Sequence, residues 1–341
     1  MKKILLILTA VSIGIILNGC SKTPSIDDIY SEGSSQFSNG KKEQEIILSS
    51  ADQTLDKLIS DYSDSKENPV KKDITEEEID DIIKDDDESS NTDDGKKRSE
   101  VSNRKELKKL LAEMFDSTQE TKVFVSRGGF LTSPQELIDL YYELEREDPY
   151  DAICVESFSH GVQGNINTIK IEYSLPISQL KAMKVETHKL AEEAEKKINA
   201  YGLSEYEIVN CVNQYLCNNV EYAPSEPFPP ETHTGYNAFA EGIAVCDGYS
   251  RAAKILLNDY NIECIIIHGI CNGGGAHAWN MVKIADSWYH LDVTWNDVAT
   301  QYDDTYGRMF FLVTDKYMRE SRTWVQGDYP VSSRVPYSSK K

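Results

Sequence analysis

The chain has 341 residues, with 57 acidic against 36 basic side chains and a formal net charge of −21. This acidic balance argues against nucleic-acid binding, which requires a basic footprint. Hydrophobic residues make up 40% of the sequence, and the roughly 220 residues with regular hydrophobic patterns suffice to bury a sizeable core.

The N-terminus has the pattern of an export signal. Lys2 and Lys3 precede the apolar run Ile4–Leu17, which is too short for a comfortable transmembrane helix. Leu17-Asn18-Gly19-Cys20 resembles the cleavage box of bacterial lipoproteins. We therefore predict a signal peptide over residues 1–19 and a lipid on Cys20, which would anchor the protein on the extracytoplasmic face of the cell membrane. The alternative is an uncleaved membrane anchor.

Residues 20–100 are rich in Ser, Asp, Glu and Lys, and their acidity peaks at Glu76–Glu88. Low hydrophobicity with high net charge predicts an acidic, disordered tether. The acidic peak could form a transient helix. It lacks the carboxylate spacing of a calcium loop, so solvated charge is the better interpretation.

Residues 101–200 predict a small α/β domain with the order helix, strand, helix, strand, strand, helix. A capping box at Ser133–Glu136 opens the second helix, and a turn is expected around Gly161–Asn165. The pattern does not indicate the role of this domain. The domain could orient the C-terminal part of the chain, cover a cleft in that part or bind a substrate. The expected elements are an amphipathic helix through Leu107–Phe115, a strand Thr121–Arg127, a helix to Arg146, strands Asp151–Phe158 and Asn167–Ser174, and a helix Ser178–Ala200.

Residues 201–330 contain the residues that indicate chemistry. A second capping box, Ser204–Glu207, opens a helix, and the proline-rich loop Pro224–Pro230 could border a cleft. Cys246 precedes a stripe of Ala252, Ala253, Leu256 and Leu257 at helical spacing. It therefore falls near a helix N-terminus, where unpaired N–H groups favour a thiolate and could hold an oxyanion. The neighbouring Asp247 opposes the thiolate, so a base must contribute much of the activation.

Ala276–Ile284 and Ser287–Thr294 alternate in hydrophobicity around a two-residue turn and predict a β-hairpin. With such a turn, His277 and Asp292 lie on one face, opposite or one step diagonal. An Asp beside a His fixes the tautomer of the imidazole and stabilises its cation. The helix that carries Cys246 is expected to pack over this face. The opposite, apolar face holds Ala278, Val282, Ile284, Leu291, Val293 and Trp295. Gly273–Gly275, just before the hairpin, could admit a substrate backbone or simply form a loop.

Residues from about Leu203 to Trp324 resemble the transglutaminase-like superfamily, a papain-related cysteine-enzyme fold. The matching stretches are Val220–Tyr222, Gly242–Tyr249, His277–Asn280 and Trp288–Trp295. The resemblance implies an α+β core with a Cys-His-Asp triad, carried by Cys246, His277 and Asp292. Tyr236 and Asn237 are candidate oxyanion donors, and Trp279 is a candidate for the substrate cleft. The superfamily includes crosslinkers, peptidases, deamidases and members without demonstrated activity.

The remaining cysteines do not suggest a metal or redox centre. No CxxC motif occurs, and Cys211 and Cys217 lie about 240° apart around a helix, so they should not pair. Other disulfides stay possible outside the cytoplasm. His277, His290 and Asp292 could suggest a metal site. The Cys-His-Asp order favours instead a role for the imidazole as the base of a nucleophilic site. We expect no cofactor and no metal.

The sequence thus predicts an exported, membrane-tethered cysteine acyl-transfer enzyme with a protein or peptide substrate, cell-wall peptide among the options. Peptide or carboxamide hydrolysis is favoured over crosslinking, because no amine-binding site is recognisable. The alternatives are a true crosslinking transglutaminase and a non-catalytic surface module that binds protein or cell-wall peptide with the same cleft. Residues 331–341 are expected to form a C-terminal tail.

Overall fold

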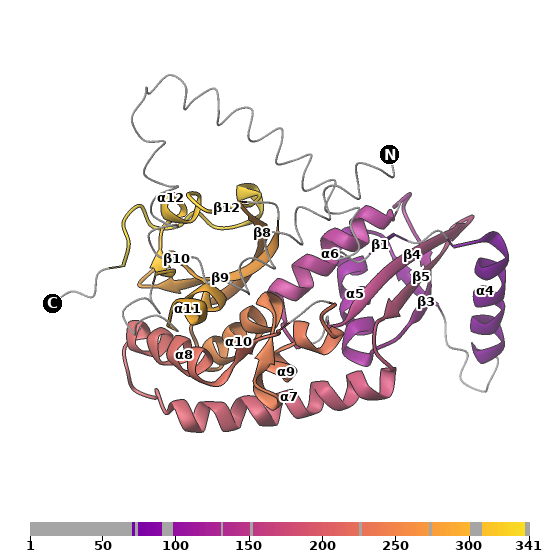
Figure 1. Cartoon of the computed structure of the whole chain (residues 1–341). Helices are drawn as coiled ribbons and strands as arrows, with labels where there is room; N and C mark the ends of the chain where they lie inside the picture. The colour runs from indigo at the N-terminus through magenta and orange to yellow at the C-terminus, as the bar shows by residue number, and fades with distance from the viewer. Residues whose placement is uncertain are drawn as a thin grey trace, which may run out of the picture.

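The computed structural model describes residues 70–71, 74–90, 98–130, 132–150, 153–224, 227–272, 275–300 and 309–337. The predicted signal peptide, Cys20 and most of the predicted tether lie outside the described residues. Among the helices of the described ranges, none has the length and apolar character that crossing a bilayer demands. The expected α+β class is confirmed: two five-stranded sheets are each packed against helices (Figure 1).

The N-terminal unit, residues 70–173, is built on a mixed sheet. Its helices α5 (Arg104–Ser117) and α6 (Pro134–Glu147) share a core with the sheet. The order expected for residues 101–200 is confirmed, because hydrophobic stripes and caps at Asn103 and Ser133 set the helices locally. The strands lie in the order β1 (Val70–Lys71), β4 (Val155–Gln163), β5 (Ile166–Tyr173), β3 (Thr121–Ser126) and β2 (Ser99–Val101).

A further helix, α4 (Glu76–Ser90), lies on the other side of this sheet from α5 and α6 (Figure 1). Its Ile79 is buried against Gly161, where an added Cβ would meet the Ile79 side chain at 2.5 Å. Gln163 also donates a hydrogen bond to Asp80 at 2.5 Å. The prediction of a tether up to residue 100 is therefore wrong over its last part, because one apolar stripe in α4 outweighs the acidic average.

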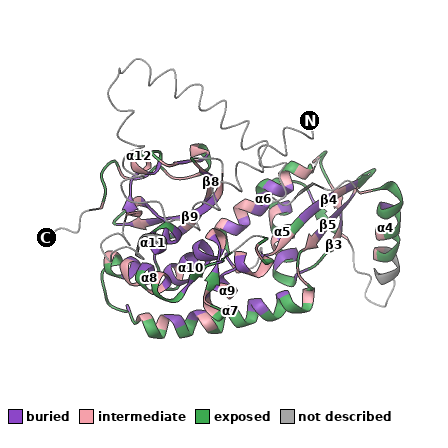
Figure 2. Ribbon diagram, in the orientation of Figure 1, coloured by how far each residue is buried: buried purple, intermediate pink, exposed green. Residues whose placement is uncertain are grey.

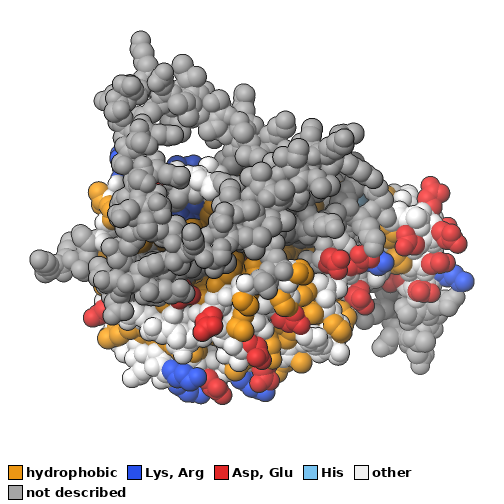
Figure 3. All heavy atoms as spheres, in the orientation of Figure 1, with side chains coloured by type: hydrophobic (Ala, Val, Ile, Leu, Met, Phe, Trp, Pro, Cys, Tyr) orange, Lys and Arg blue, Asp and Glu red, His pale blue; other side chains and the backbone are white. Residues whose placement is uncertain are grey.

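The acidic character of α4 is expressed on its solvent side. Glu76, Glu77 and Glu78 are exposed, and acidic side chains gather in this region of the surface (Figure 3). Gly161, expected in a turn, instead lies inside β4, and the turn itself falls at Gly164 and Asn165. A glycine in a strand often marks the close approach of another element, which here is α4.

The long helix α7 (Ile177–Ile198) joins the N-terminal unit to the C-terminal unit, residues 204–337. At its start, Leu180 and Met183 pack with Ile153. Near its end, Ala194 belongs to the core of the C-terminal unit. Figure 2 shows buried and exposed residues alternating along it, with the exposed side turned outward. The two units are therefore joined through a shared helix.

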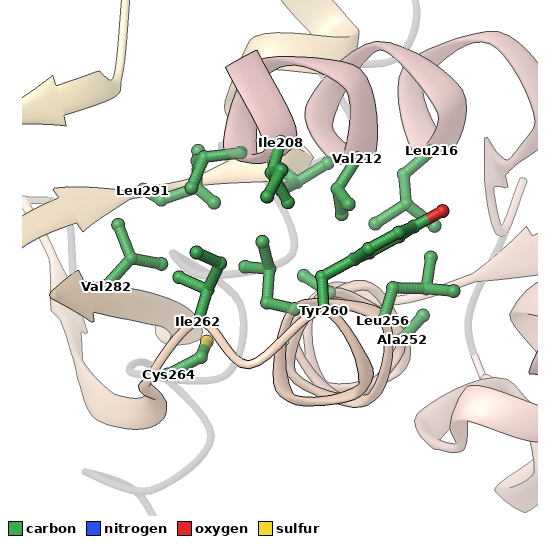
Figure 4. Packing of buried hydrophobic residues seen from close by; sticks show 14 of the residues in the cluster. Ile208, Val212, Leu216, Ala252, Leu256, Tyr260, Ile262, Cys264, Val282 and Leu291 are labelled. Atoms are coloured by element: carbon green, nitrogen blue, oxygen red, sulfur yellow. The ribbon is translucent and has the colours of Figure 1, made fainter. Parts of the chain in front are cut away.

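The C-terminal unit has an antiparallel sheet with helices packed on one face. The helices are α8 (Glu205–Asn219), opened by the predicted Ser204–Glu207 capping box, and α10 (Cys246–Asp259). Figure 4 shows their side chains meeting those of the sheet, with Ile208 and Val212 facing Leu256 and Leu291. The strand order is β11 (Phe311–Val313), β10 (Ser287–Leu291), β9 (Ala276–Ile284), β8 (Cys264–Cys271) and β12 (Arg322–Thr323).

Both faces of this sheet are covered. Ile267, Trp279 and Met281 face the second side and pack with Met318 and Trp324. Helix α10 is enclosed almost completely, because every residue from Gly248 to Leu257 is buried. Burial of each large apolar side chain contributes about 1.5–3 kcal/mol, so the position of α10 is strongly fixed. The smaller elements are β6 (Glu221–Tyr222), η1 (Pro230–His233), α9 (Gly235–Ala240), β7 (Ile243–Ala244), α11 (Val293–Thr300), α12 (Asp315–Met318) and η3 (Gln326–Asp328).

Candidate active site

Cys246 is the first residue of α10, as its sequence setting predicts, and Val245 is the N-cap. The amide of Val245 donates to the carbonyl of Thr232 at 3.0 Å. Gly248 allows the first turn to lie against the same loop, because an added Cβ would lie 2.4 Å from the Thr232 oxygen. The thiol is thus placed by a rigid helix start and by a loop that touches its backbone.

The surroundings of Cys246 do not favour a preformed thiolate. Burial raises the pKa of its thiol well above the ordinary value, and the charge of Asp247 raises it further. A hydrogen bond from the backbone amide of Ala278 acts in the opposite direction. The expected gain from the helix N-terminus is therefore outweighed, and the resting sulfur holds its proton. A base is required to remove it, as the presence of Asp247 predicts.

The Ala278 amide also locates the sulfur relative to the predicted base. Ala278 follows His277 directly in β9, so a sulfur that accepts its N–H lies beside the end of the strand that carries His277. His277 is buried and its Nε2 lies 2.7 Å from Oδ2 of Asp292. The hairpin register pairs Ser287 with Ile284, which makes the two residues diagonal neighbours on one face, as predicted.

Asp292 does not lie on a strand, and in this respect the prediction is wrong. Strand β10 ends at Leu291, and α11 begins at Val293. Oδ1 of Asp292 accepts the backbone N–H of Trp295 at 3.1 Å, which is the hydrogen bond of a helix N-cap. The expected strand to Thr294 therefore stops where Asp292 caps a new helix, and the cap holds the carboxylate on the side of His277.

Helix α10 packs on the opposite face of the sheet from the one predicted. Its Leu256 lies in one cluster with Val282 and Leu291, whereas His277 stacks on Trp279 on the other face. The physical reason is that a helix with an apolar stripe buries it against the apolar face, not against a His-Asp pair. The hydrogen bond with the Ala278 amide places the Cys246 sulfur at the end of β9, beside the residue that follows His277.

Arg322 is a member of this site that sequence reasoning missed. Its Nη2 lies 2.6 Å from Oδ2 of Asp292, and both side chains are almost completely buried. Burial would raise the pKa of Asp292, but the charges of His277 and Arg322 lower it to about 2. Asp292 is therefore an anion with two cationic or hydrogen-bonding neighbours. Arg322 lies far along the chain in β12, and no spacing rule connects it with Asp292.

The tryptophans near the site divide into core and surface. Trp279, expected in a substrate cleft, is 1% exposed and packs on Trp324, so that expectation is wrong. Trp295 is 39% exposed and meets the ring of His277 edge-on at 6.5 Å. A substrate bound at the described site could touch this aromatic side chain. Trp295 lies in α11 and not in the hairpin, because strand β10 ends at Leu291.

Tyr236 and Asn237, the candidate oxyanion donors, have other contacts. Tyr236 packs against the cluster of Ile153, Leu180 and Met183. The side-chain amide of Asn237 donates to the carbonyl of Ile243 at 2.7 Å. Among the contacts of the described residues, none gives these two side chains a place at the Cys246 sulfur. The first N–H groups of α10 are the better oxyanion donors, because they have no partner within the helix.

His290 does not join the site. Its Nδ1 accepts from Trp279 at 2.9 Å, and its Nε2 lies 2.8 Å from Asp315. Burial lowers its pKa, and the Nδ1 that accepts from Trp279 carries no proton, so the ring is neutral. Within the described ranges, no three His, Cys, Asp or Glu side chains are grouped so that they could hold a metal ion. The six cysteines from Cys154 onward are all free thiols.

A second polar network begins at the partly exposed Asp247. Its carboxylate lies 2.8 Å from Nδ1 of His233. Burial would raise the pKa of Asp247, but His233 and the nearby charges of His268 and Arg251 hold it low. Arg251 and His268 both bind Glu145 of α6, the latter at 2.5 Å. Glu145 of the N-terminal unit thus binds two residues whose charges act on the residue next to the thiol.

The comparison with known families concerns one segment of the chain. The sequence model of the transglutaminase-like superfamily matches residues 192–293. This segment belongs to that superfamily. The match includes Cys246, His277 and Asp292 and extends from the end of α7 into the start of α11. The similarity to the transglutaminase-like superfamily therefore concerns this segment of the α+β fold.

Solved structures show weaker likeness. A structure named as that of a TGase is 15% identical over 58% of this chain and 59% of its own, with a TM-score of 0.29. A candidate cysteine protease from Cytophaga hutchinsonii is 18% identical over 38% and 52%, with a TM-score of 0.28. A candidate protease from Parabacteroides distasonis is 10% identical over 40% and 35%, with a TM-score of 0.25. The chain thus spans less than two thirds of each structure, and no curated protein matches it.

Proposed function

We propose that the protein is an exported, membrane-tethered cysteine acyl-transfer enzyme that hydrolyses peptide or carboxamide bonds. The observation that supports this most strongly is the hydrogen bond from Ala278 to the Cys246 sulfur, next to a His277 that is bonded to Asp292. A thiol, a base and a residue that orients the base are the three parts of a nucleophilic site.

In the proposed reaction, His277 takes the thiol proton as the Cys246 sulfur attacks the carbonyl carbon. The N–H groups at the start of α10 stabilise the negative oxygen of the tetrahedral intermediate. The C–N bond breaks, and the leaving amine or ammonia takes the proton from His277. The product of this half-reaction is a thioester on Cys246.

Water then attacks the thioester carbonyl and gives one proton to His277. The C–S bond breaks, the acid is released, and the sulfur regains a proton from His277. An amine in place of water would give transfer or crosslinking by the same steps. We favour water, because no amine-binding residues are recognisable in the sequence and water is abundant outside the cell.

The membrane location in this proposal derives from the sequence of residues 1–20. Lys2, Lys3 and the apolar run support export, and Cys20 would carry the lipid. A protein or peptide substrate fits this location, and cell-wall peptide is one candidate. Trp295, exposed beside His277, offers an apolar surface for the substrate.

The test uses the detergent-solubilised full chain with glutamine-containing peptides and cell-wall fragments. New amino termini or released ammonia indicate hydrolysis, whereas incorporation of a fluorescent primary amine indicates transfer. Cys246→Ala should abolish either signal and keep the fold. Turnover that survives in this variant would overturn the mechanism, and binding of a fragment without turnover would favour the surface-module alternative.

A further inference from the structure

Arg322 and His277 share one oxygen of Asp292. Nη2 of Arg322 lies 2.6 Å from Oδ2, and Nε2 of His277 lies 2.7 Å from the same atom. A Cys-His-Asp site needs only the second of these contacts to orient the imidazole. The first contact therefore requires a separate explanation, and it bears on the charge of the site.

The Arg322 cation is held firmly in place. Its guanidinium lies 4.1 Å from the ring centre of Phe310 and 5.2 Å from that of Trp295. Nη1 donates to the hydroxyl of Ser321 at 2.6 Å. The side chain is 1% exposed. Burying a charge costs several kcal/mol unless a partner compensates for it, and Asp292 is that partner.

The pair changes what Asp292 can do for His277. A lone carboxylate beside an imidazole stabilises the imidazolium, which in turn stabilises a thiolate. With Arg322 on the same oxygen, the pair is neutral as a whole, and the imidazolium gains much less. The arrangement therefore favours a Cys246 sulfur that keeps its proton over a preformed thiolate.

The other charged and titratable groups around the site act in the same direction or are balanced. Asp247 of α10 opposes a thiolate at Cys246. The negative charge of Asp247 in turn interacts with His233 of η1 and with His268 of β8. Cys271 of β8, which pairs in register with Arg322, is a thiol whose pKa burial raises to about 11. The opposite charges of Arg251 and Glu145 form an ion pair and compensate each other.

We propose that Arg322 is a positioning residue that limits how far Asp292 can stabilise a cation on His277, so that Cys246 keeps its proton in the resting site. The proton then passes from Cys246 to His277 during the attack on the carbonyl, and not before substrate arrives. This inference rests on the proposed function, because it assumes that Cys246 and His277 exchange a proton. It assigns to a residue of the last strand, outside the matched family segment, control over the charge of the nucleophile.

The experiment measures the rate of Cys246 alkylation by iodoacetamide against pH in the full chain, with the labelled residue identified by mass spectrometry. Arg322→Gln removes the charge and keeps a donor, so the midpoint of the profile should fall by roughly one pH unit or more. Arg322→Lys keeps the charge, and its midpoint should stay near that of the wild type. Arg319→Gln removes the same charge from an exposed side chain nearby and should leave the midpoint unchanged.

A double-mutant cycle keeps the test decisive if one variant folds poorly. Asp292→Asn leaves Arg322 without its anion and should raise the midpoint, and adding Arg322→Gln to it should bring the midpoint back toward the wild type. A folded Arg322→Gln protein with an unchanged midpoint, or a double variant no lower than Asp292→Asn, would overturn the role of Arg322. Failure of the wild-type Cys246 to react at any pH would instead contradict the proposed function.

Discussion

At the residue scale, Asp292 has the most contacts of functional interest. Its two oxygens accept from His277, from Arg322 and from the N–H of Trp295. The carboxylate therefore orients the predicted base, neutralises a buried cation and caps α11. A side chain with three such contacts should be sensitive to the loss of its charge, even when its shape is kept.

Asp292→Asn should lower turnover by a large factor with little change in substrate binding. The analogous change in a serine triad costs about 10⁴ in turnover, and we expect a smaller loss here because a thiol is intrinsically more nucleophilic than a hydroxyl. Stability should fall by about 3 kcal/mol, since Arg322 is left buried without its anion. Steady-state kinetics and thermal melts measure both effects.

The His290–Asp315 pair provides a matched control for this variant. It is a second buried His with a carboxylate at 2.8 Å, on the same sheet and on α12. Asp315→Asn should destabilise the fold and leave the kinetics of the folded protein near those of the wild type. Equal turnover in both variants would mean that Asp292 is structural and that Cys246 and His277 act as a dyad.

Gly248 shows how a single hydrogen atom can set the position of the nucleophile. Gly248→Ala would bring a methyl group to 2.4 Å from the carbonyl oxygen of Thr232 and 2.8 Å from Cβ of Ala244. The first turn of α10 must then shift, at a cost of about 1–3 kcal/mol, and turnover should fall with it. Gly327→Ala meets nothing within 4 Å and is the control. Wild-type melting and turnover of Gly248→Ala would show that the loop yields freely.

At the element scale, α4 is the element whose packing the acidic composition conceals. Ile79→Ala should lower stability by about 2 kcal/mol, because the side chain is 8% exposed and fills the space above Gly161. That loss corresponds to a drop of several degrees in Tm, measurable by calorimetry. Glu77→Ala changes an exposed residue of the same helix and should have little effect. An unchanged Tm for Ile79→Ala would show that α4 contributes nothing to the fold.

Local patterns predicted most of the elements, since caps and periodicity act over a few residues. The order of residues 101–200, the capping box at Ser204 and the hairpin register of His277 with Asp292 all depend on such short-range rules. The errors concern contacts between distant parts of the chain. The face on which α10 packs, the ion pair with Arg322 and the approach of α4 to Gly161 depend on tertiary packing, which no local spacing encodes.

At the scale of the whole molecule, a buried ion network joins the two units. Glu145 of α6 binds Arg251 of α10 and His268 of β8. Burial works to lower the pKa of His268, but the charge of Glu145 and its hydrogen bond raise it on balance. A raised pKa means that the folded protein holds this proton more tightly than the unfolded chain does.

Glu145→Gln should therefore destabilise the protein in a pH-dependent way. The contribution of protonated His268 is fully present below its unfolded pKa of about 6.5 and is lost as pH rises through the higher folded value. The gap in Tm between wild type and variant should be wider at pH 6 than at pH 9. Glu143→Gln, which breaks a half-exposed ion pair on the same helix, should give a small gap. A gap that does not change with pH would mean that His268 is not protonated in the fold.

The sequence pattern places a domain boundary at residue 200. The pattern of a helix does not show which hydrophobic core the helix packs into. Leu180 and Ala194 of α7 lie in different clusters. A boundary drawn after this helix would separate Ala194 from its neighbours in α8 and α10. The N-terminal unit, whose role the sequence leaves open, is thus joined to the site both by α7 and by Glu145.

The protonated state of the Cys246 sulfur has a consequence for the lifetime of the protein. Thiolates attack peroxides and disulfides far faster than thiols do. A nucleophile that keeps its proton until a substrate arrives presents little to such oxidants between turnovers. In an oxidising compartment, a site of this kind would react more slowly with substrate than a preformed thiolate would. Its sulfur would also be oxidised more slowly and would stay active for longer.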